Sequence, residues 1–519
     1  FSTFGYGYIL RKSFLKYSNA PVSSNFFLGF IVLILIQYFI YIFFKINAFT
    51  NSIILFFGFA ISLKYFLKKK IFFNYSIIYL LLFTCLIVIK PHDDFHHHFS
   101  SVLTYLNKDF TFGLHNLDPV FGYQPPTVFL QTLTIIPPLY ENFFYIFNYI
   151  IYLTFLIFLY EIYDDNKFDD IYKYISIVIF FFFLIKLNRL SEHGNDLPGQ
   201  IFLLNFFIMF YIVDKDHNNF DNLIIGSLFF ILSIAIKTPN IILMPMYLFV
   251  LYKYFKNQKL SKKIFFKYLN ICMFFSLVVL FNNFQKSGCF VPLATFSCLE
   301  LNWGVNLNEI KKFIIYSELD TKGFYNFDLH NFKDPNLYLK FYNWFPIWIK
   351  THFFYKVFEF FLTFFIIFII CSFFVKFKKT KQVFKPKYEI FFILFSILSI
   401  VIWLNVFPQV RYFYGGLLIF LTLICFYFIK NELSLDKKKI KISILIVIIL
   451  TNIFNLNRIL KEHKKYENYL INIPLIHYPI EKISMINEYQ MLCRTDYKCE
   501  YKKDLILKKN RFYNILYLN

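Results

Sequence analysis

The chain has 519 residues, of which 58% are hydrophobic and 17% charged, and it carries 78 phenylalanines and a formal net charge of +22. This composition excludes an ordinary soluble globular domain, because one core could not bury so much apolar surface. The positive charge needs no nucleic-acid partner, since the basic residues lie mainly in short connections between apolar runs, as the positive-inside rule expects. The sequence therefore predicts an all-α polytopic membrane protein.

Apolar runs suited to transmembrane helices, which need about 20 residues each, recur along the chain. We expect about thirteen spans, which would form one polytopic membrane domain over residues 1–455. The runs lie near residues 26–44, 51–67, 71–89, 140–162, 174–187, 198–213, 223–236, 240–252, 268–284, 353–375, 388–406, 412–429 and 440–455.

Lysine-rich connections give the orientation of these spans. Four of them fall on one side of the arrangement, near residues 68–70, 253–267, 376–387 and 430–441. The positive-inside rule makes this side cytoplasmic. Four segments fall on the opposite side: the first large external loop (90–139), a short loop (188–197), a long loop (285–352) and the C-terminal tail (456–519). The tail is lysine-rich too, but long segments are translocated largely regardless of charge, so we expect an extracytoplasmic C-terminus.

Four cysteines fall in segments assigned to the outside and form two sequence-local pairs. An oxidising compartment allows the disulfides Cys289–Cys298 and Cys493–Cys499. From spacing alone, four unpaired thiols are an equally good interpretation. No pair has the spacing of a zinc site, so a cysteine-based metal site is not expected.

The sequence carries no sign of a nucleotide-binding domain. It contains no glycine-rich phosphate loop, dinucleotide fingerprint or nucleophile elbow, and its cytoplasmic connections are too short to hold such a domain. Chemistry is therefore expected at the membrane face, with a substrate delivered from the bilayer or the outer compartment.

Two carboxylates and four imidazoles follow the third apolar run, in the segment HDDFHHH at residues 92–98. Ionisable groups at a membrane boundary indicate a functional site. A helix N-terminus would explain one aspartate but not the whole set. In a helix, Asp93 with His97 and Asp94 with His98 share faces at i and i+4, where such pairs can orient a base or hold a divalent cation. We favour a functional site at Asp93, Asp94 and His98.

The next segment, residues 99–112, spaces Val102, Leu103, Leu106 and Phe110 like one face of a helix. It predicts an interfacial helix followed by a tight loop at residues 113–119, and this helix would form one wall of a groove open to lipid. The alternative is an ordinary external loop packed on the bundle.

A second set of ionisable residues lies in the loop RLSEHGNDLP at 189–198. Helix capping by Asn195 or Asp196, with Pro198 in the first turn, explains it, and we favour that interpretation. Glu192 and Asp196 remain secondary candidates for a functional role.

Two cations stand at the ends of spans. Arg411 lies on the external side, where few basic residues are expected, and arginine suits a lipid-linked phosphate because it binds oxygen pairs and keeps its charge. Lys237 lies beside a helix break at Pro239. Snorkelling to the interface and neutralising a carboxylate is an equally good interpretation of Arg411, and packing at a span end is the alternative for Lys237.

Together these residues resemble the GT-C superfamily of integral membrane glycosyltransferases, and more closely a bacterial multi-pass family of uncharacterised function related to it. The resemblance runs over most of the chain. It rests on the order and spacing of His92-Asp93-Asp94 with a following His, Gly113-Leu114 with Asn116-Leu117, Asp196-Leu197-Pro198, Lys237, Ser287-Gly288 with Pro292 before Trp303, Pro408 with Arg411, and the late Cys493/Cys499 pair.

The resemblance implies a GT-C-like helical bundle with external loops above a lipid-facing groove. It also implies a bacterial inner-membrane enzyme of cell-envelope glycan assembly that uses a polyprenyl-phosphate sugar donor and a glycan or lipid acceptor. Asp93 or Asp94 would be the catalytic or metal-binding carboxylate, accepting the acceptor's proton. The departing phosphate would be stabilised by Arg411, Lys237, His98 or a divalent cation, Mg or Mn, at the aspartates.

Two positions depart from the family pattern. Cys289-Phe290 stands where an aromatic-Pro dipeptide usually follows Ser-Gly, and Gln409-Val410 replaces the acidic residue often found just before the arginine. The second change argues against an Asp–Arg couple at this site.

Other classes of protein fit some of the same residues. A transporter or flippase of lipid-linked glycans would use the acidic groups to relay protons or bind a coupling ion, but the chain shows no internal repeat. A membrane scaffold whose tail docks a partner is also compatible with the composition.

Overall fold

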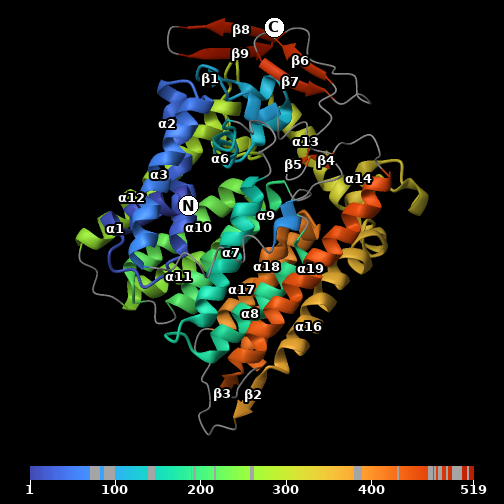
Figure 1. Ribbon diagram of the computed structural model, residues 1–519. Coiled ribbons are helices and arrows are strands. Elements are labelled where there is room, and N and C mark those ends of the chain that lie inside the picture. The colour runs from blue at the N-terminus through green and yellow to red at the C-terminus, as the bar shows by residue number, and fades with distance from the viewer. Residues whose placement is uncertain are drawn as a thin grey trace.

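Long helices packed side by side dominate the computed structural model (Figure 1). The structure describes residues 1–69, 82–86, 100–137, 146–188, 190, 194–214, 218–257, 262–378, 389–428, 432–465, 471–472, 475–476, 482–486, 489–493, 505–510 and 513–518. Within these residues, eight helices are long and apolar enough to cross a membrane. The chain is therefore a helical, polytopic membrane protein, and the number of thirteen crossings stays a prediction.

Helices lie at every expected span except 71–89, of which only residues 82–86 are described. The longer helices are α1 (Ser2–Phe14), α2 (Ser24–Phe43), α3 (Ala48–Lys69), α7 (Ile146–Asp164), α8 (Asp170–Lys186), α9 (Asp196–Ile208), α10 (Phe220–Ile236), α11 (Met244–Asn257), α12 (Lys262–Ser287), α13 (Leu307–Thr321), α16 (Glu359–Ser372), α17 (Glu389–Val406), α18 (Val410–Phe428) and α19 (Lys437–Lys465). Helix α19 continues past residue 455, where we expected the membrane domain to end.

Helix α9 and its π-helical continuation η6 (Met209–Val213) form the centre of the bundle, with 94% of their residues buried. Helices α7, α10 and α18 contact α9. Its sequence is apolar on most sides, as expected of a helix enclosed all round, with Gln200 and Asn205 as buried polar side chains. Phe206 illustrates the packing, because its ring lies 4.6 Å from the ring of Phe230 on α10.

Outer helices keep large apolar side chains on their exposed faces. Phe56 on α3, Leu277 on α12, Ile369 on the α16 segment and Leu450 on α19 are each more than half exposed. Such surfaces are costly in water and suited to lipid, and helices satisfy their own backbone groups there.

The N-terminal helix α1 packs closely against α2 and α3, and small residues allow the approach. A Cβ atom on Gly7 would overlap the carbonyl of Asn25, and one on Gly29 would overlap the carbonyl of Thr3. Glycine at these positions lets the two backbones touch.

Segments far apart in sequence meet at one end of the bundle. Strand β1 (Thr111–Phe112) pairs in parallel with β9 (Asn514–Leu518), which pairs antiparallel with β8 (Leu505–Lys509), at the top of Figure 1. The side-chain amide of Asn116 also donates to the carbonyl of Leu516 at 2.9 Å. The first external loop and the tail therefore lie together, as their assignment to one side of the membrane requires.

The opposite end carries lysine-rich connections. Strand β2 (Val375–Lys378) pairs antiparallel with β3 (Glu432–Leu435), at the bottom of Figure 1. Two short hairpins complete the strands that the structure describes: β4 (Ile471–Asn472) with β5 (Leu475–Ile476), and β6 (Lys482–Ile486) with β7 (Tyr489–Cys493).

The interfacial helix expected over residues 99–112 is wrong for most of its length. In the described part, only residues 100–103 are helical. Leu106 then forms a bridge with Ile46, and Asn107, at a φ of 57°, donates its N–H to the Ile46 carbonyl at 2.8 Å. The backbone therefore pairs with the chain just after α2. Val102, Leu103 and Phe110 are buried in a core together with Ile46, and this burial competes with their burial in lipid.

The tight loop expected at residues 113–119 is present. Gly113 has a φ of 78°, which favours glycine, and a turn of 3-10 helix follows it in η2 (Leu114–Asn116). Asp118 accepts a hydrogen bond from the N–H of Val120 at 2.9 Å, so that Asp118 caps η3 (Pro119–Tyr123) with proline at its first position.

Candidate functional site

Of the candidate catalytic and phosphate-binding residues, the structure describes Asp196, Lys237 and Arg411. The other candidates, Asp93, Asp94, His98 and Glu192, lie outside the described residues, and so does Cys499 of the proposed Cys493–Cys499 pair. Within the described ranges, no group of three or more His, Cys, Asp or Glu side chains gathers as a metal site would require.

Asp196 and Lys237 form an ion pair between the start of α9 and the end of α10. Both side chains are largely shielded, with 21% and 17% of their surface exposed. Gly199 allows this contact, because a Cβ atom there would lie 2.8 Å from the Cβ of Lys237. The pairing also corrects the expected capping role: Asn195 makes no side-chain cap bond to α9, and its Oδ1 accepts instead from Thr127 at 3.1 Å.

The ring of Tyr412 joins Lys237 to Arg411. The Lys237 ammonium lies 4.0 Å from the ring centroid, and the Arg411 guanidinium carbon lies 4.8 Å from it. Arg411 also donates to the Tyr412 hydroxyl at 2.9 Å. Cations are attracted to the faces of aromatic rings, so one tyrosine holds two positive groups from different helices close together.

A kink in α18 and a buried glutamine fix the position of Tyr412. Phe413 has a φ of −146°, so the first turn of α18 is bent away from the rest of the helix. The freed backbone groups are satisfied by Gln200 of α9, whose amide donates to the Tyr412 carbonyl at 3.0 Å and accepts from the Gly415 N–H at 2.9 Å. The same amide donates to Asn240 at 3.0 Å. Polar bonds therefore tie α9, α18 and the segment after Lys237 to one another.

Two tryptophans hold the turn that leads into Arg411. The indole N–H of Trp348 donates to the Pro408 carbonyl at 2.7 Å, and that of Trp403 donates to the Gln409 carbonyl at 3.1 Å. Buried indoles need such partners, so these bonds position the turn.

Carboxylates reach Arg411 through space rather than from its neighbours in sequence. Asp196 and Asp320, the latter near the end of α13, both interact electrostatically with the guanidinium. Sequence reasoning missed Tyr412 and Asp320, since nothing in their local context marks them. An Asp–Arg couple, which the sequence argued against at this site, is thus approached by carboxylates from other segments.

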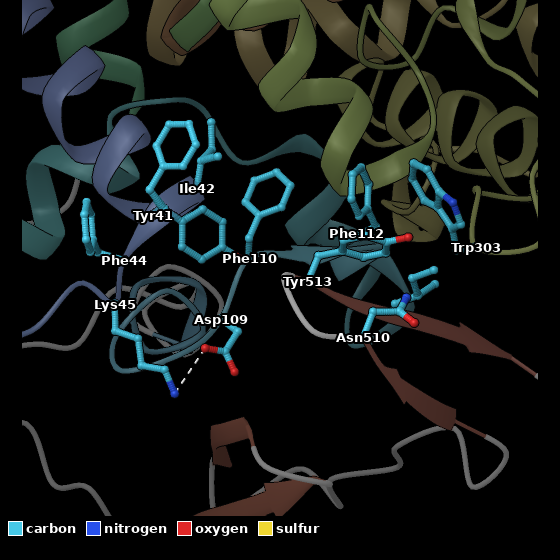
Figure 2. Close-up of a pocket in the computed structure, with 12 residues that line it drawn as sticks. Tyr41, Ile42, Phe44, Lys45, Asp109, Phe110, Phe112, Trp303, Asn510 and Tyr513 are labelled. Atoms are coloured by element: carbon cyan, nitrogen blue, oxygen red, sulfur yellow. Dashed lines mark ion pairs between the residues drawn. The ribbon is translucent and has the colours of Figure 1, made fainter.

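A cavity of about 920 Å³ opens at the same end of the bundle as β1 and β9 (Figure 2). It is lined by the end of α2, the residues around β1, Trp303 of the long loop, and the β8–β9 hairpin. The ion pair Lys45–Asp109, 3.1 Å between Nζ and Oδ1, stands at its rim.

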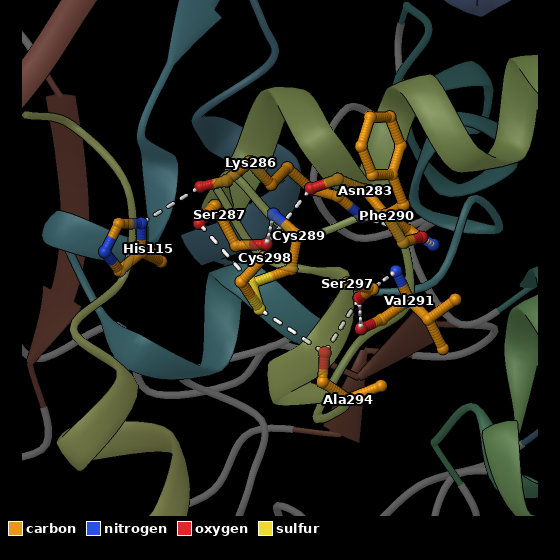
Figure 3. Close-up of a disulfide and its surroundings, with 10 residues drawn as sticks. All are labelled: His115, Asn283, Lys286, Ser287, Cys289, Phe290, Val291, Ala294, Ser297 and Cys298. Carbon is orange, nitrogen blue, oxygen red and sulfur yellow. Dashed lines mark hydrogen bonds between the residues drawn. A yellow bond between two sulfur atoms is a disulfide. The ribbon is translucent and has the colours of Figure 1, made fainter. Parts of the chain in front are cut away.

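The end of α12 carries the Ser287-Gly288 motif and the disulfide Cys289–Cys298 (Figure 3). Gly288 has a φ of 77°, and its N–H donates to the Phe284 carbonyl at 2.7 Å, which ends the helix. The disulfide closes the loop that follows the helix. It is the first of the two pairings considered from the sequence. The motif therefore has a structural role in turning the chain.

Lys286, one residue earlier, is fully buried. Its ammonium donates to the Gln124 carbonyl at 2.5 Å and to Asn283 Oδ1 at 3.3 Å. Nδ1 of His115 lies 3.1 Å from the Lys286 carbonyl (Figure 3). A carbonyl can only accept, so Nδ1 carries the hydrogen in this contact. These bonds join the first external loop to α12.

The helices and their lipid-suited outer faces define an integral membrane protein with a charged site at one end of its bundle. A family model described as a domain of unknown function (DUF8201) matches residues 1–418. The chain therefore belongs to this family. No curated protein and no solved structure matches it.

Proposed function

We propose that this protein is a glycosyltransferase of the bacterial inner membrane. It transfers a sugar from a polyprenyl-phosphate-linked donor to a glycan or lipid acceptor on the outer face, in cell-envelope glycan assembly. The observation that carries the proposal is the convergence of Lys237 and Arg411 on the ring of Tyr412. A departing lipid phosphate needs preorganised positive charge, and two cations from separate helices supply it at one place.

The two cations have different roles in binding the phosphate. Lys237 is engaged by Asp196, which holds its ammonium in a fixed position. Arg411 is exposed and, within the described ranges, makes a hydrogen bond only to Tyr412. Its remaining N–H groups suit two phosphate oxygens at once. Arg411 would therefore meet the phosphate first, with Lys237 adding charge beside it.

Transfer forms a bond between the acceptor oxygen and the anomeric carbon and breaks the bond from that carbon to the phosphate oxygen. The polyprenyl phosphate leaves with the electron pair, and the proton of the acceptor hydroxyl passes to a carboxylate base. Asp196 is occupied by Lys237. The resemblance to GT-C enzymes assigns the role of base to Asp93 or Asp94, either directly or with a bound divalent cation such as Mg or Mn.

Purified protein in lipid, supplied with polyprenyl-phosphate sugars and an acceptor, tests the proposal. Arg411→Gln should lower the rate of transfer by roughly 10² to 10³-fold, the usual loss for one group that stabilises developing charge. Asp93→Asn and Asp94→Asn should identify the base by the larger loss. Lys186→Gln, which removes the exposed ion pair with Glu359, is the matched control and should leave transfer unchanged.

Lys237 needs a paired design, because removing it leaves Asp196 uncompensated. The double variant Asp196→Asn/Lys237→Gln restores neutrality and should fold like the parent protein, yet lose transfer. A parent protein that transfers no sugar but moves lipid-linked glycans across vesicles would replace the enzyme with the flippase. Full activity in Arg411→Gln would remove the cluster from the mechanism.

A further inference from the structure

We propose that the cavity between the end of α2 and the β8–β9 hairpin is a binding site for a neutral pyranose unit of a glycan. This site is separate from the Asp196–Lys237–Arg411 cluster. The proposal concerns binding alone and stands whether or not the protein transfers a sugar.

Aromatic rings form a continuous row along the cavity (Figure 2). The ring centroids of Tyr41 and Phe110 are 5.2 Å apart, and those of Phe110 and Phe112 are also 5.2 Å apart. Phe112 in turn lies 5.1 Å from Trp303 and 5.6 Å from Tyr513. Two of these four pairs, Phe110–Phe112 and Phe112–Tyr513, pack edge to face, and the other two are tilted, so the rings present a surface at several angles.

Hydrogen bonds and strand pairing fix the position of this row of aromatic rings. The Tyr41 hydroxyl accepts the N–H of Thr111 at 3.0 Å, and Phe112 lies in β1, which pairs with β9. Tyr41 is fully buried, whereas Tyr513 is 38% exposed. A ligand would therefore meet a preformed apolar wall, with one half-open ring at its edge.

The charged side chains among the described lining residues balance each other, which favours a neutral ligand. Among the lining residues that the structure describes, Lys45 and Asp109 are the only pair of ionisable side chains of opposite sign, and they neutralise each other across 3.1 Å. A phosphate or a quaternary ammonium would have to break this pair. Their oxygen and nitrogen atoms, with the Asn510 amide and the Tyr513 hydroxyl, remain able to exchange hydrogen bonds with hydroxyl groups.

A pyranose ring matches this combination of surfaces. One face of the sugar carries C–H groups that pack on aromatic rings, and its edge carries hydroxyls that need polar partners. A lipid acyl chain would gain nothing from the ion pair and the amide at the rim. The size of about 920 Å³ is within the range of sites for ligands larger than one sugar ring.

Binding of soluble trisaccharides to the purified full chain tests the proposal. The probes are maltotriose, mannotriose and chitotriose, titrated by calorimetry in a polyoxyethylene detergent, because the headgroup of a maltoside detergent would compete. We expect at least one probe to bind the parent protein. Phe112→Ala should weaken that binding by about tenfold, the scale of one lost aromatic contact, whereas Phe112→Tyr should retain it.

Phe296→Ala is the control, since Phe296 is 91% exposed in the disulfide loop and lines no part of the cavity. Its binding and thermal unfolding should match those of the parent. Failure of all three probes to bind would overturn the proposal, as would equal weakening in Phe112→Ala and Phe296→Ala. Quenching of Trp303 fluorescence by brominated lipid, absent from Trp303→Phe, would show that acyl chains fill the cavity and would also overturn it.

Discussion

At the scale of single residues, Gln200 decides whether the charged cluster is ordered. It is fully buried on α9 and satisfies both the Tyr412 carbonyl and the Gly415 N–H, which the kink at Phe413 removes from the helix ladder. Buried backbone groups without partners cost about 1–3 kcal/mol each. The geometry of Tyr412, and with it the approach of both cations, therefore depends on a neutral side chain that carries no chemistry itself.

Gln200→Leu tests this dependence. The substitution keeps the volume and removes the amide, so the protein should lose about 2–4 kcal/mol of stability. Thermal unfolding in detergent should show a lower midpoint than for the parent. Asn205→Leu, on the same buried helix, is the control, because the amide atoms of Asn205 have no hydrogen-bond partner among the described residues. If both variants unfold at the parent's midpoint, Gln200 does not hold the cluster.

Residue-scale features were only partly predictable. Asp196, Lys237 and Arg411 drew notice because charge at the end of a span is unusual. Their contacts could not be read from the sequence, since they come from three helices that the chain visits at widely separated positions. Tyr412 could not be recognised at all among 40 tyrosines. Its role arises only from the Lys237 ammonium above its ring.

At the scale of elements, hydrophobic runs predicted the helices well and the external segments poorly. A span such as α2 must satisfy its backbone internally, so the local sequence determines it. Residues 104–112, by contrast, take their structure from Ile46 and from β9, both distant in sequence. Their apolar side chains are spaced as in a helix, but backbone pairing with Ile46 and β9 determines their structure instead.

The close packing of α1 against α2 depends on Gly7, which can be tested by substitution. Gly7→Ala should separate α1 from α2, because the new Cβ would overlap the Asn25 carbonyl and backbone cannot move aside easily. Limited proteolysis of the detergent-solubilised protein should then cut within residues 1–20 faster than in the parent. Ser13→Ala, at an exposed position of the same helix, should not change the rate. Equal rates in Gly7→Ala and the parent would mean that α1 docks without this contact.

At the scale of the whole molecule, the two ends of the bundle differ in what they gather. One end joins the first external loop, the long loop and the tail through β1, β9 and the contacts of Asn116. The other end holds the paired strands β2 and β3 with their lysines. The two ends thus separate segments that the charge pattern assigns to opposite sides of the membrane, while the side that each end faces stays a prediction.

Cysteine labelling in sealed vesicles of known orientation tests the division. Single cysteines at Asn306 and Asn510 should react with a membrane-impermeant maleimide from the same side, and those at Lys167 and Ser434 only from the other. Cys493 and Cys499 are replaced by serine beforehand, while Cys85, Cys272, Cys371 and Cys425 are buried and should give little background. Reaction of Asn306 and Ser434 positions from one side would contradict the arrangement.

The pairing of β9 with β1 has a consequence for biosynthesis. Asn116 and Leu516, which are bonded across this junction, are 400 residues apart in sequence. Contacts of such separation form late, after the loop between them has been closed. The aromatic cavity therefore stays incomplete until every intervening helix has entered the membrane and the β8–β9 hairpin has reached β1. A chain stalled or shortened before β8 would insert its helices yet leave β1 as an open, aggregation-prone edge beside an incomplete cavity.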